Sequence, residues 1–171
     1  SVKKLWMNNF LSFGEDNVIN HKNLNGLTVV NSFPENQGGK TIFTIDSLLF
    51  LFFGKTTKTD TNIEVFNTYT DNDNVLVGGQ IEIDGDEYVI ERKLSRKKSK
   101  NGEYGVSSKL EFYRVLSDGT EENLEGEQRR ETDKLIEETI GSYDDFMLTI
   151  VATEKNLEDL METKPTQRGR L

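Results

Sequence analysis

The residues with the clearest chemical potential in this sequence are four consecutive ones, Gly38-Gly39-Lys40-Thr41, which match the end of a phosphate-binding loop. A β-branched, apolar segment (27–30) precedes them, and a predicted helix (40–53) follows. In such a strand–loop–helix order, backbone N–H groups and a helix N-terminus converge on an anion. Lys40 would reach the terminal phosphates, and the Thr41 hydroxyl would ligate Mg²⁺ beside them. The predicted nucleotide site comprises Asn36, Gln37, Gly38, Gly39, Lys40 and Thr41.

At one position this loop departs from the pattern G-x-x-x-x-G-K-[ST], and at a second it differs from many ATPases. Pro34 replaces the first glycine, and proline fixes φ and removes an N–H donor. Gln37 stands where glycine is common, and it adopts positive φ less easily than glycine does. The alternative interpretation is a chance Gly-Gly-Lys-Thr in a turn before a core helix.

A second candidate site is basic. Six cations fall within nine residues of a chain whose net charge is −9 and whose pI is about 4.8: Arg92, Lys93, Arg96, Lys97, Lys98 and Lys100. Such a cluster at a hairpin end favours contact with DNA phosphates, here through Arg96, Lys97, Lys98 and Lys100. The competing interpretation is a solvated hairpin end whose charge discourages pairing with another strand. The sequence places no aromatic platform beside these charges, so base stacking is not predicted.

The elements that would hold these residues follow from local patterns. The segment 40–53 is apolar on nearly every side, so it predicts a helix enclosed between layers, with Gly54 as its left-handed cap. Asp84-Gly85 between alternating runs predicts a hairpin of 80–83 with 87–93. Ser142 opens a capping box for a helix over 143–152. Further strands are expected at 2–10, 18–21, 27–30 and 108–116, a short element near 63–66 within a loop, and a helix at 125–140.

Composition limits the class of protein. The chain has 171 residues, ten Phe and no Cys, which fits one folded domain without disulfides or thiolate metal sites. His21 is the sole histidine, so a zinc site is excluded. The most apolar run, 42–53, is shorter than the roughly 20 residues that a bilayer needs. We therefore expect a soluble, cytoplasmic protein with no membrane partner.

Six segments, in order, resemble the N-terminal lobe of SbcC-type ATPases, the SMC-like subunits of DNA double-strand-break nucleases. Residues 9–14 (NFLSFG) are similar to the opening motif of that family, and 36–41 (NQGGKT) to its phosphate loop. Residues 48–54 resemble its apolar helix ending in LFG, and 81–92 its β-hairpin closing on an arginine. Residues 143–146 (YDDF) resemble a helix of that family, and 160–168 (LMETKPTQR) resemble the stretch that leads into its long coiled coil.

The resemblance implies an α/β fold with α+β character: a P-loop NTPase head lobe of the ABC type, with an antiparallel β-hairpin subdomain and C-terminal helices leading to a coiled coil. Its parts would be 1–54 (strands, phosphate loop and helix), 55–75 (loop), 76–120 (hairpin region) and 121–171 (helical part). ATP and Mg²⁺ would be the cofactors. Glu154 falls where the family has its Q-loop glutamine, so with Thr41 it would face the metal.

The same resemblance implies the function of an ATP-binding lobe in DNA repair and recombination, as part of an ATPase that regulates a partner exonuclease. The implied partners are the C-terminal lobe of the same protein, a second head in a homodimer, a nuclease subunit of the SbcD type, and double-stranded DNA. The expected compartment is the cytoplasm of a bacterium or of a phage-infected host cell. The signature motif and Walker B pair are not in this sequence, so we expect no useful ATP turnover by this chain alone.

Two alternatives remain open at this point. The first is a degenerate lobe that binds DNA or a partner and turns over no ATP. The second is a self-contained P-loop kinase or GTPase, which would need its own Walker B strand. No convincing strand of that kind follows residue 54.

Overall fold

A tight turn at Asp84 and Gly85 organises the centre of the fold. Both residues have positive φ, 51° and 85°, as a two-residue hairpin turn with the twist of its strands requires. The turn joins β3 (Asn74–Ile83) to β4 (Asp86–Lys98), which pair antiparallel over their length. The predicted hairpin is confirmed and is longer than expected. The computed structural model describes residues 1–20 and 45–149 of the chain.

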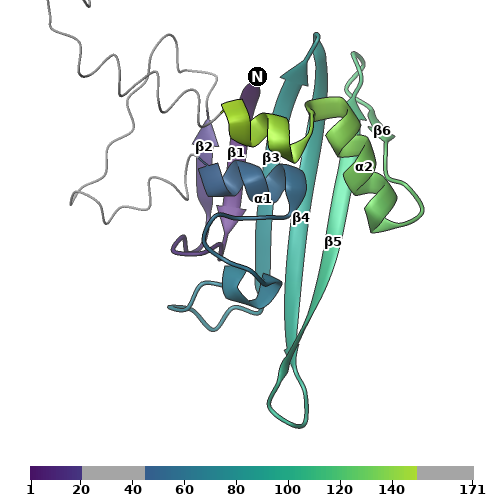
Figure 1. Cartoon of the computed structure of the whole chain (residues 1–171). Coiled ribbons are helices and arrows are strands. Elements are labelled where there is room, and N and C mark those ends of the chain that lie inside the picture. The colour runs from purple at the N-terminus through teal and green to yellow at the C-terminus, as the bar shows by residue number, and fades with distance from the viewer. Residues whose placement is uncertain (21–44, 150–171) are drawn as a thin grey trace, which may run out of the picture.

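The described strands form one antiparallel sheet in the order β2-β1-β3-β4-β5-β6 (Figure 1). β1 (Val2–Asn8) lies inside the sheet between β2 (Asn17–Asn20) and β3. On the other side, β4 pairs with β5 (Tyr104–Val115), and the short β6 (Glu121–Asn123) completes the edge. Sequential hairpins account for most connections, whereas β1 and β3 are brought together across the α1 region.

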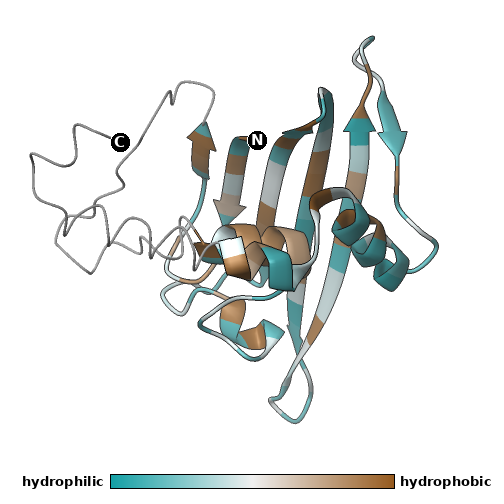
Figure 2. Cartoon of the chain, turned by 45° about the horizontal axis from the view of Figure 1, so that its top comes forward, coloured by the Kyte–Doolittle hydropathy of each residue, from teal (hydrophilic) through white to brown (hydrophobic). Residues whose placement is uncertain are grey.

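The helices gather on one face of this sheet (Figure 1). They are α1 (Ser47–Phe53), the 3₁₀ turn η3 (Asn62–Val65), α2 (Arg129–Ile140) and a further helical stretch at 143–149. Within α1, Leu49 and Leu51 are fully buried, and hydrophobic residues lie along this helix and the strands behind it (Figure 2). Gly54 has φ 66° and its N–H bonds to the carbonyl of Phe50 at 2.9 Å. The buried helix and its glycine cap are confirmed for the residues described.

Two adjacent glycines in β3 let side chains cross the sheet closely on both faces. A Cβ on Gly78 would lie 2.1 Å from the indole of Trp6, and one on Gly79 would lie 2.5 Å from Leu51 Cδ2. Trp6 therefore lies flat over β3 on one face, and α1 packs directly on β3 on the other.

The expected fold class is wrong for the described residues. They form a small, mostly β domain: one six-stranded antiparallel sheet with short helices, the longest spanning 12 residues. A P-loop NTPase head of the ABC type would place helices between parallel strands, but each described strand pairs antiparallel with its neighbours. The description of this chain as an ATP-binding ABC ATPase head with a Walker A loop and a coiled coil is corrected accordingly. Two of the six segments behind that expectation, 36–41 and 160–168, lie outside the described residues.

The remaining predictions about helices are confirmed in part. The short element near 63–66 is η3. Ser142 caps the helical stretch at 143–149, since Asp145 N–H donates to Ser142 Oγ at 3.1 Å, which is one of the two hydrogen bonds of the expected capping box. The helix expected over 125–140 begins at Arg129. In this helix Ile136 is fully buried, whereas Leu135 is 38 % exposed. No helix among residues 1–20 and 45–149 is long and apolar enough to cross a membrane.

Candidate functional site

The predicted nucleotide residues cannot be placed. Asn36, Gln37, Gly38, Gly39, Lys40, Thr41 and Glu154 all lie outside the described residues. The structure describes the part of the chain that follows them, which starts with α1, six residues after Thr41, and it describes the elements that pack against α1.

Arg92 joins three elements beneath the C-terminal end of α1. From β4, its Nε donates to the carbonyl of Leu51 at 2.7 Å, and its Nη2 donates to the carbonyl of Phe52 at 2.8 Å. The same Nη2 meets Asp133 Oδ1 of α2 at 2.6 Å. A cation at the last carbonyls of a helix satisfies acceptors that have no partner within the helix and also favours its dipole. Arg92 therefore fixes α1 to both the sheet and α2.

This arginine is 6 % exposed, so its charge is largely removed from water. Burial is the main cause that lowers the pKa of Arg92, while the charge and hydrogen bond of Asp133 oppose that shift. Nearby Arg129 lowers the pKa further through like-charge repulsion. Because the charged form persists, the Asp133 carboxylate and the two carbonyls are what keep it stable in the interior.

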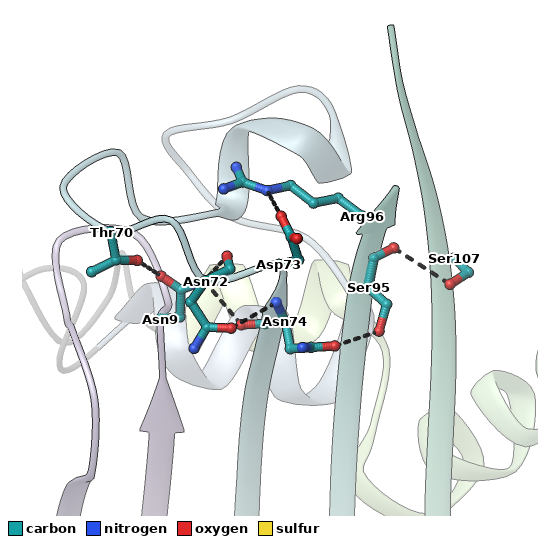
Figure 3. A network of polar contacts seen from close by, with 8 residues as sticks. All are labelled: Asn9, Thr70, Asn72, Asp73, Asn74, Ser95, Arg96 and Ser107. Carbon is teal, nitrogen blue, oxygen red and sulfur yellow. Dashed lines mark hydrogen bonds and ion pairs between the residues drawn. The ribbon is translucent and has the colours of Figure 1, made fainter. Parts of the chain in front are cut away.

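A polar network lies at the end of the sheet where β1 stops and β3 begins (Figure 3). At its centre is Asn9, fully buried, with φ 56°. Its Nδ2 donates to the carbonyls of Asn72 and Asn74 at 2.8 and 2.9 Å, and its Oδ1 accepts from Thr70 Oγ1 at 2.5 Å. Asn9 thereby fixes the loop that leads into β3.

Arg96 extends this network towards the hairpin of β4 and β5. Its Nε donates to Asp73 Oδ1 at 3.0 Å, and its backbone N–H donates to the Asp73 carbonyl (Figure 3). Its guanidinium also lies over two rings, 4.9 Å from the centroid of Phe66 and 5.1 Å from that of Tyr104. With its side chain 16 % exposed, Arg96 is largely committed to contacts within the chain.

The basic cluster seen in the sequence divides into cations that form ion pairs and cations for which the described residues provide none. Lys93 pairs with Glu111 at 3.2 Å, in addition to the pairing of Arg92 and Arg96 described above. Among the residues that the structure describes, no ion pair involves Lys97, Lys98 or Lys100. We call the hairpin end at 96–104 the basic arm. It projects past the ends of β1 and β3 (Figure 1).

The basic arm contains an aromatic residue that the sequence interpretation missed. Tyr104 pairs in register with Lys98, is 45 % exposed and lies 5.8 Å from Lys98 Nζ at its ring centroid. The sequence does show that Tyr104 is the first aromatic residue after the turn, six residues from Lys98. Only the pairing register of β4 and β5 reveals that the two residues lie opposite each other. Tyr69, 88 % exposed, also stands in the loop leading to β3.

Segments that carry the family resemblance meet in space. Phe53, next to the cap Gly54, packs edge-on against Tyr143 with ring centroids 5.5 Å apart, and its ring is tilted against that of Phe146 with centroids 5.8 Å apart. Arg92 of the hairpin contacts the same end of α1. Phe10, which follows Asn9, lies 5.2 Å from Phe50. No cluster of three or more potential metal-binding side chains occurs within residues 1–20 and 45–149.

No protein-family profile matches the chain. It is similar to an uncharacterized protein of Acanthamoeba polyphaga mimivirus, with 28 % identity over 169 residues. That alignment covers 96 % of this chain and 12 % of the relative, so the chain spans about an eighth of that protein's length.

Proposed function

We propose that this chain is a lobe of an SbcC-like DNA repair or recombination protein, and that its described body is a scaffold with a DNA-contacting arm. The observation that carries the proposal is the meeting of four family-like segments at α1. These segments are far apart in sequence yet share one packed region. They are Asn9 and Phe10, α1 with its cap Gly54, Arg92 of β4, and Tyr143 with Phe146.

The basic arm supports the DNA part of the proposal. Lys97, Lys98 and Lys100 are exposed and are not neutralised by ion pairs among the residues described. An acidic protein repels DNA over most of its surface, so binding requires cations concentrated on a projecting element. Arg96 and Asp73 hold the base of the arm, which limits the entropy lost when the arm meets a phosphate backbone. Arg96 acts mainly as a support in this proposal.

In this proposal the chain works within a larger assembly. Its partners would be a further lobe, a second copy of the whole protein and a nuclease of the SbcD type, as the resemblance implies. Binding of ATP and Mg²⁺ through Lys40 and Thr41 stays a prediction, as does the role of Glu154. It is tested by titrating ATP with Mg²⁺ against the chain and its Lys40→Ala variant.

The DNA part is tested by fluorescence anisotropy with a labelled duplex of about 30 base pairs over a range of salt concentrations. Replacing Lys97, Lys98 and Lys100 with Ser should weaken binding at least tenfold and reduce the slope of log K against log salt by about 2.7, since each phosphate contact contributes about 0.9. The matched control replaces three other exposed cations, Lys58, Arg130 and Lys134, with Ser.

Both variants change the net charge equally, so they separate a local site from a general charge effect. The control should retain most of the affinity and slope. Equal losses in the two variants would show that no arm-specific site exists. If the duplex does not bind even at low salt, the DNA part fails, whereas the ATP titration still tests the SbcC-like assignment.

A further inference from the structure

A small polar cavity lies where α1, η3, β4, β5 and the start of α2 meet. Its volume is about 70 Å³, the size of one small ionic group. Its polar lining includes Asn62, Arg92, Ser108, Arg129 and Asp133, and Gly54 forms part of its wall. Its lining residues include none of the basic arm.

The charges around this cavity do not balance. Asp133 is shared by two arginines: its Oδ1 lies 2.6 Å from Arg92 Nη2, and its Oδ2 lies 3.6 Å from Arg129 Nε. One carboxylate thus faces two guanidinium groups, which leaves an excess of positive charge. Lys93 and Lys109 also line the cavity and share the carboxylate of Glu111. Arg92 is 6 % exposed, so water screens its charge poorly, whereas the Arg129 side chain is 56 % exposed and is screened more fully. The repulsion between the two arginines, which lowers the pKa of Arg92, has the same origin.

Donor groups in the cavity also exceed the available acceptors. Arg92 uses Nε and Nη2 for the carbonyls of Leu51 and Phe52 and for Asp133, and no hydrogen bond from its Nη1 is found within the described ranges. A Cβ at position 54 would lie 3.3 Å from that Nη1, so glycine leaves this side of the guanidinium uncovered. Arg129 donates from Nη1 to Ser108 Oγ, which orients its guanidinium towards the same cavity. A tetrahedral oxyanion matches such planar, two-donor groups.

We infer that this cavity is a binding site for a single phosphate group, held between Arg92 and Arg129. The volume admits the phosphate but no attached base or sugar, so the ligand is inorganic phosphate or the terminal phosphate of a larger molecule. A bound phosphate would bridge β4 and α2 and thereby stiffen the support under the C-terminal end of α1. The inference is independent of the proposed DNA arm, because it uses no residue of that arm.

The test uses the full chain and inorganic phosphate, with binding measured by calorimetry and by the ¹H–¹⁵N signals of the arginine side chains. Phosphate should shift the Nε–Hε signals of Arg92 and Arg129. The Arg129→Gln variant should bind at least tenfold more weakly, as expected for loss of a charge-assisted contact. The control is Arg130→Gln, which removes the same charge from the next, exposed residue of α2 and should retain affinity.

A third variant should increase the affinity for phosphate. Asp133→Asn keeps an oxygen acceptor but removes the one carboxylate between the arginines, so folded protein of this variant should bind phosphate more tightly. Nucleoside 5′-monophosphate and oligonucleotides with a 5′-phosphate or a 5′-hydroxyl end then identify the source of the phosphate. Unshifted arginine signals at millimolar phosphate, equal losses in the Arg129 and Arg130 variants, or weaker binding by Asp133→Asn would each overturn the inference.

Discussion

The indole Nε1 of Trp6 in β1 donates a hydrogen bond of 2.9 Å to Glu91 Oε2 in β4, across the strand that separates them. The contact is possible because Gly78 of β3 has no side chain beneath the ring. Trp6 is the only tryptophan of the chain, so this arrangement can be followed by its fluorescence.

Replacing Gly78 with Ala should displace Trp6, because the new Cβ would lie 2.1 Å from ring atoms. We expect a loss of about 2–3 kcal/mol in the free energy of unfolding, in the range of overpacked sites, and a red-shifted tryptophan emission. Chemical denaturation followed by fluorescence measures both. Gly105→Ala in β5 is the control, since its nearest contact is 3.9 Å away. Similar stability and emission for the two variants would contradict this packing.

Removing the carboxylate of Asp133 should destabilise the chain, because Arg92 would keep its charge in the interior without a counter-ion. Breaking a buried pair costs about 3–5 kcal/mol; since the Asp133 side chain is 33 % exposed, we expect about 2–3 kcal/mol for Asp133→Ala. Urea unfolding measures the change. Glu137→Ala, on the exposed face of α2, should change stability by less than about 0.5 kcal/mol. A loss for Asp133→Ala no larger than that of the control would be the contrary result.

Local patterns predicted the parts of the fold that depend on neighbours in sequence. The Asp84-Gly85 turn, the glycine cap at Gly54 and the Ser142 cap all involve residues within a few positions of each other. The burial of Arg92 and the use of Gly78 depend on contacts 40 or more residues apart, and no short-range pattern records them.

The basic cluster shows what more could have been read from the sequence. Strand alternation places Arg92 and Arg96 on one face of β4 and Lys93 and Lys97 on the other, so the six cations never formed one surface. That separation was predictable once 87–98 was recognised as a strand. The pairing of Arg96 with Asp73 was not, because it depends on how the loop after η3 returns to the sheet.

Asn9 should prove one of the most sensitive positions in the polar network of Figure 3. Asn9→Ala would leave the carbonyls of Asn72 and Asn74 without their shared donor and would place a residue less tolerant of positive φ at 56°. We expect a loss of about 2–4 kcal/mol from unsatisfied groups and backbone strain together. Thermal or urea unfolding measures it.

A matched variant separates those two causes. Asp84→Ala also substitutes a residue at φ 51°, but at an exposed hairpin turn, so it should lose only the strain, about 1 kcal/mol. If Asn9→Ala cost no more than Asp84→Ala, the hydrogen bonds of Asn9 would contribute nothing to stability.

Glu111 provides a prediction for pH. The hydrogen bond from Lys109 is the main cause that lowers the pKa of Glu111 below its ordinary value of 4.5, with a further contribution from Lys93. The two lysine nitrogens lie 2.5 and 3.2 Å from the carboxylate. An acid whose pKa is lower in the folded state stabilises the protein above the unfolded pKa, and this contribution disappears as the pH falls through the folded value. The contribution should therefore be complete above about pH 5.5 and decline below 4.5.

The measurement is the free energy of unfolding in urea between pH 7 and pH 3, for the chain and its Glu111→Gln variant. Glu111→Gln should be less stable at pH 7 by about 0.2–1 kcal/mol, as for partly exposed ion pairs, and the difference should shrink in acid. Glu103→Gln, at an exposed carboxylate in the turn of the basic arm, controls for the loss of one negative charge. A difference between the chain and Glu111→Gln that stays constant down to pH 3 would show that Glu111 gains nothing from its two lysines.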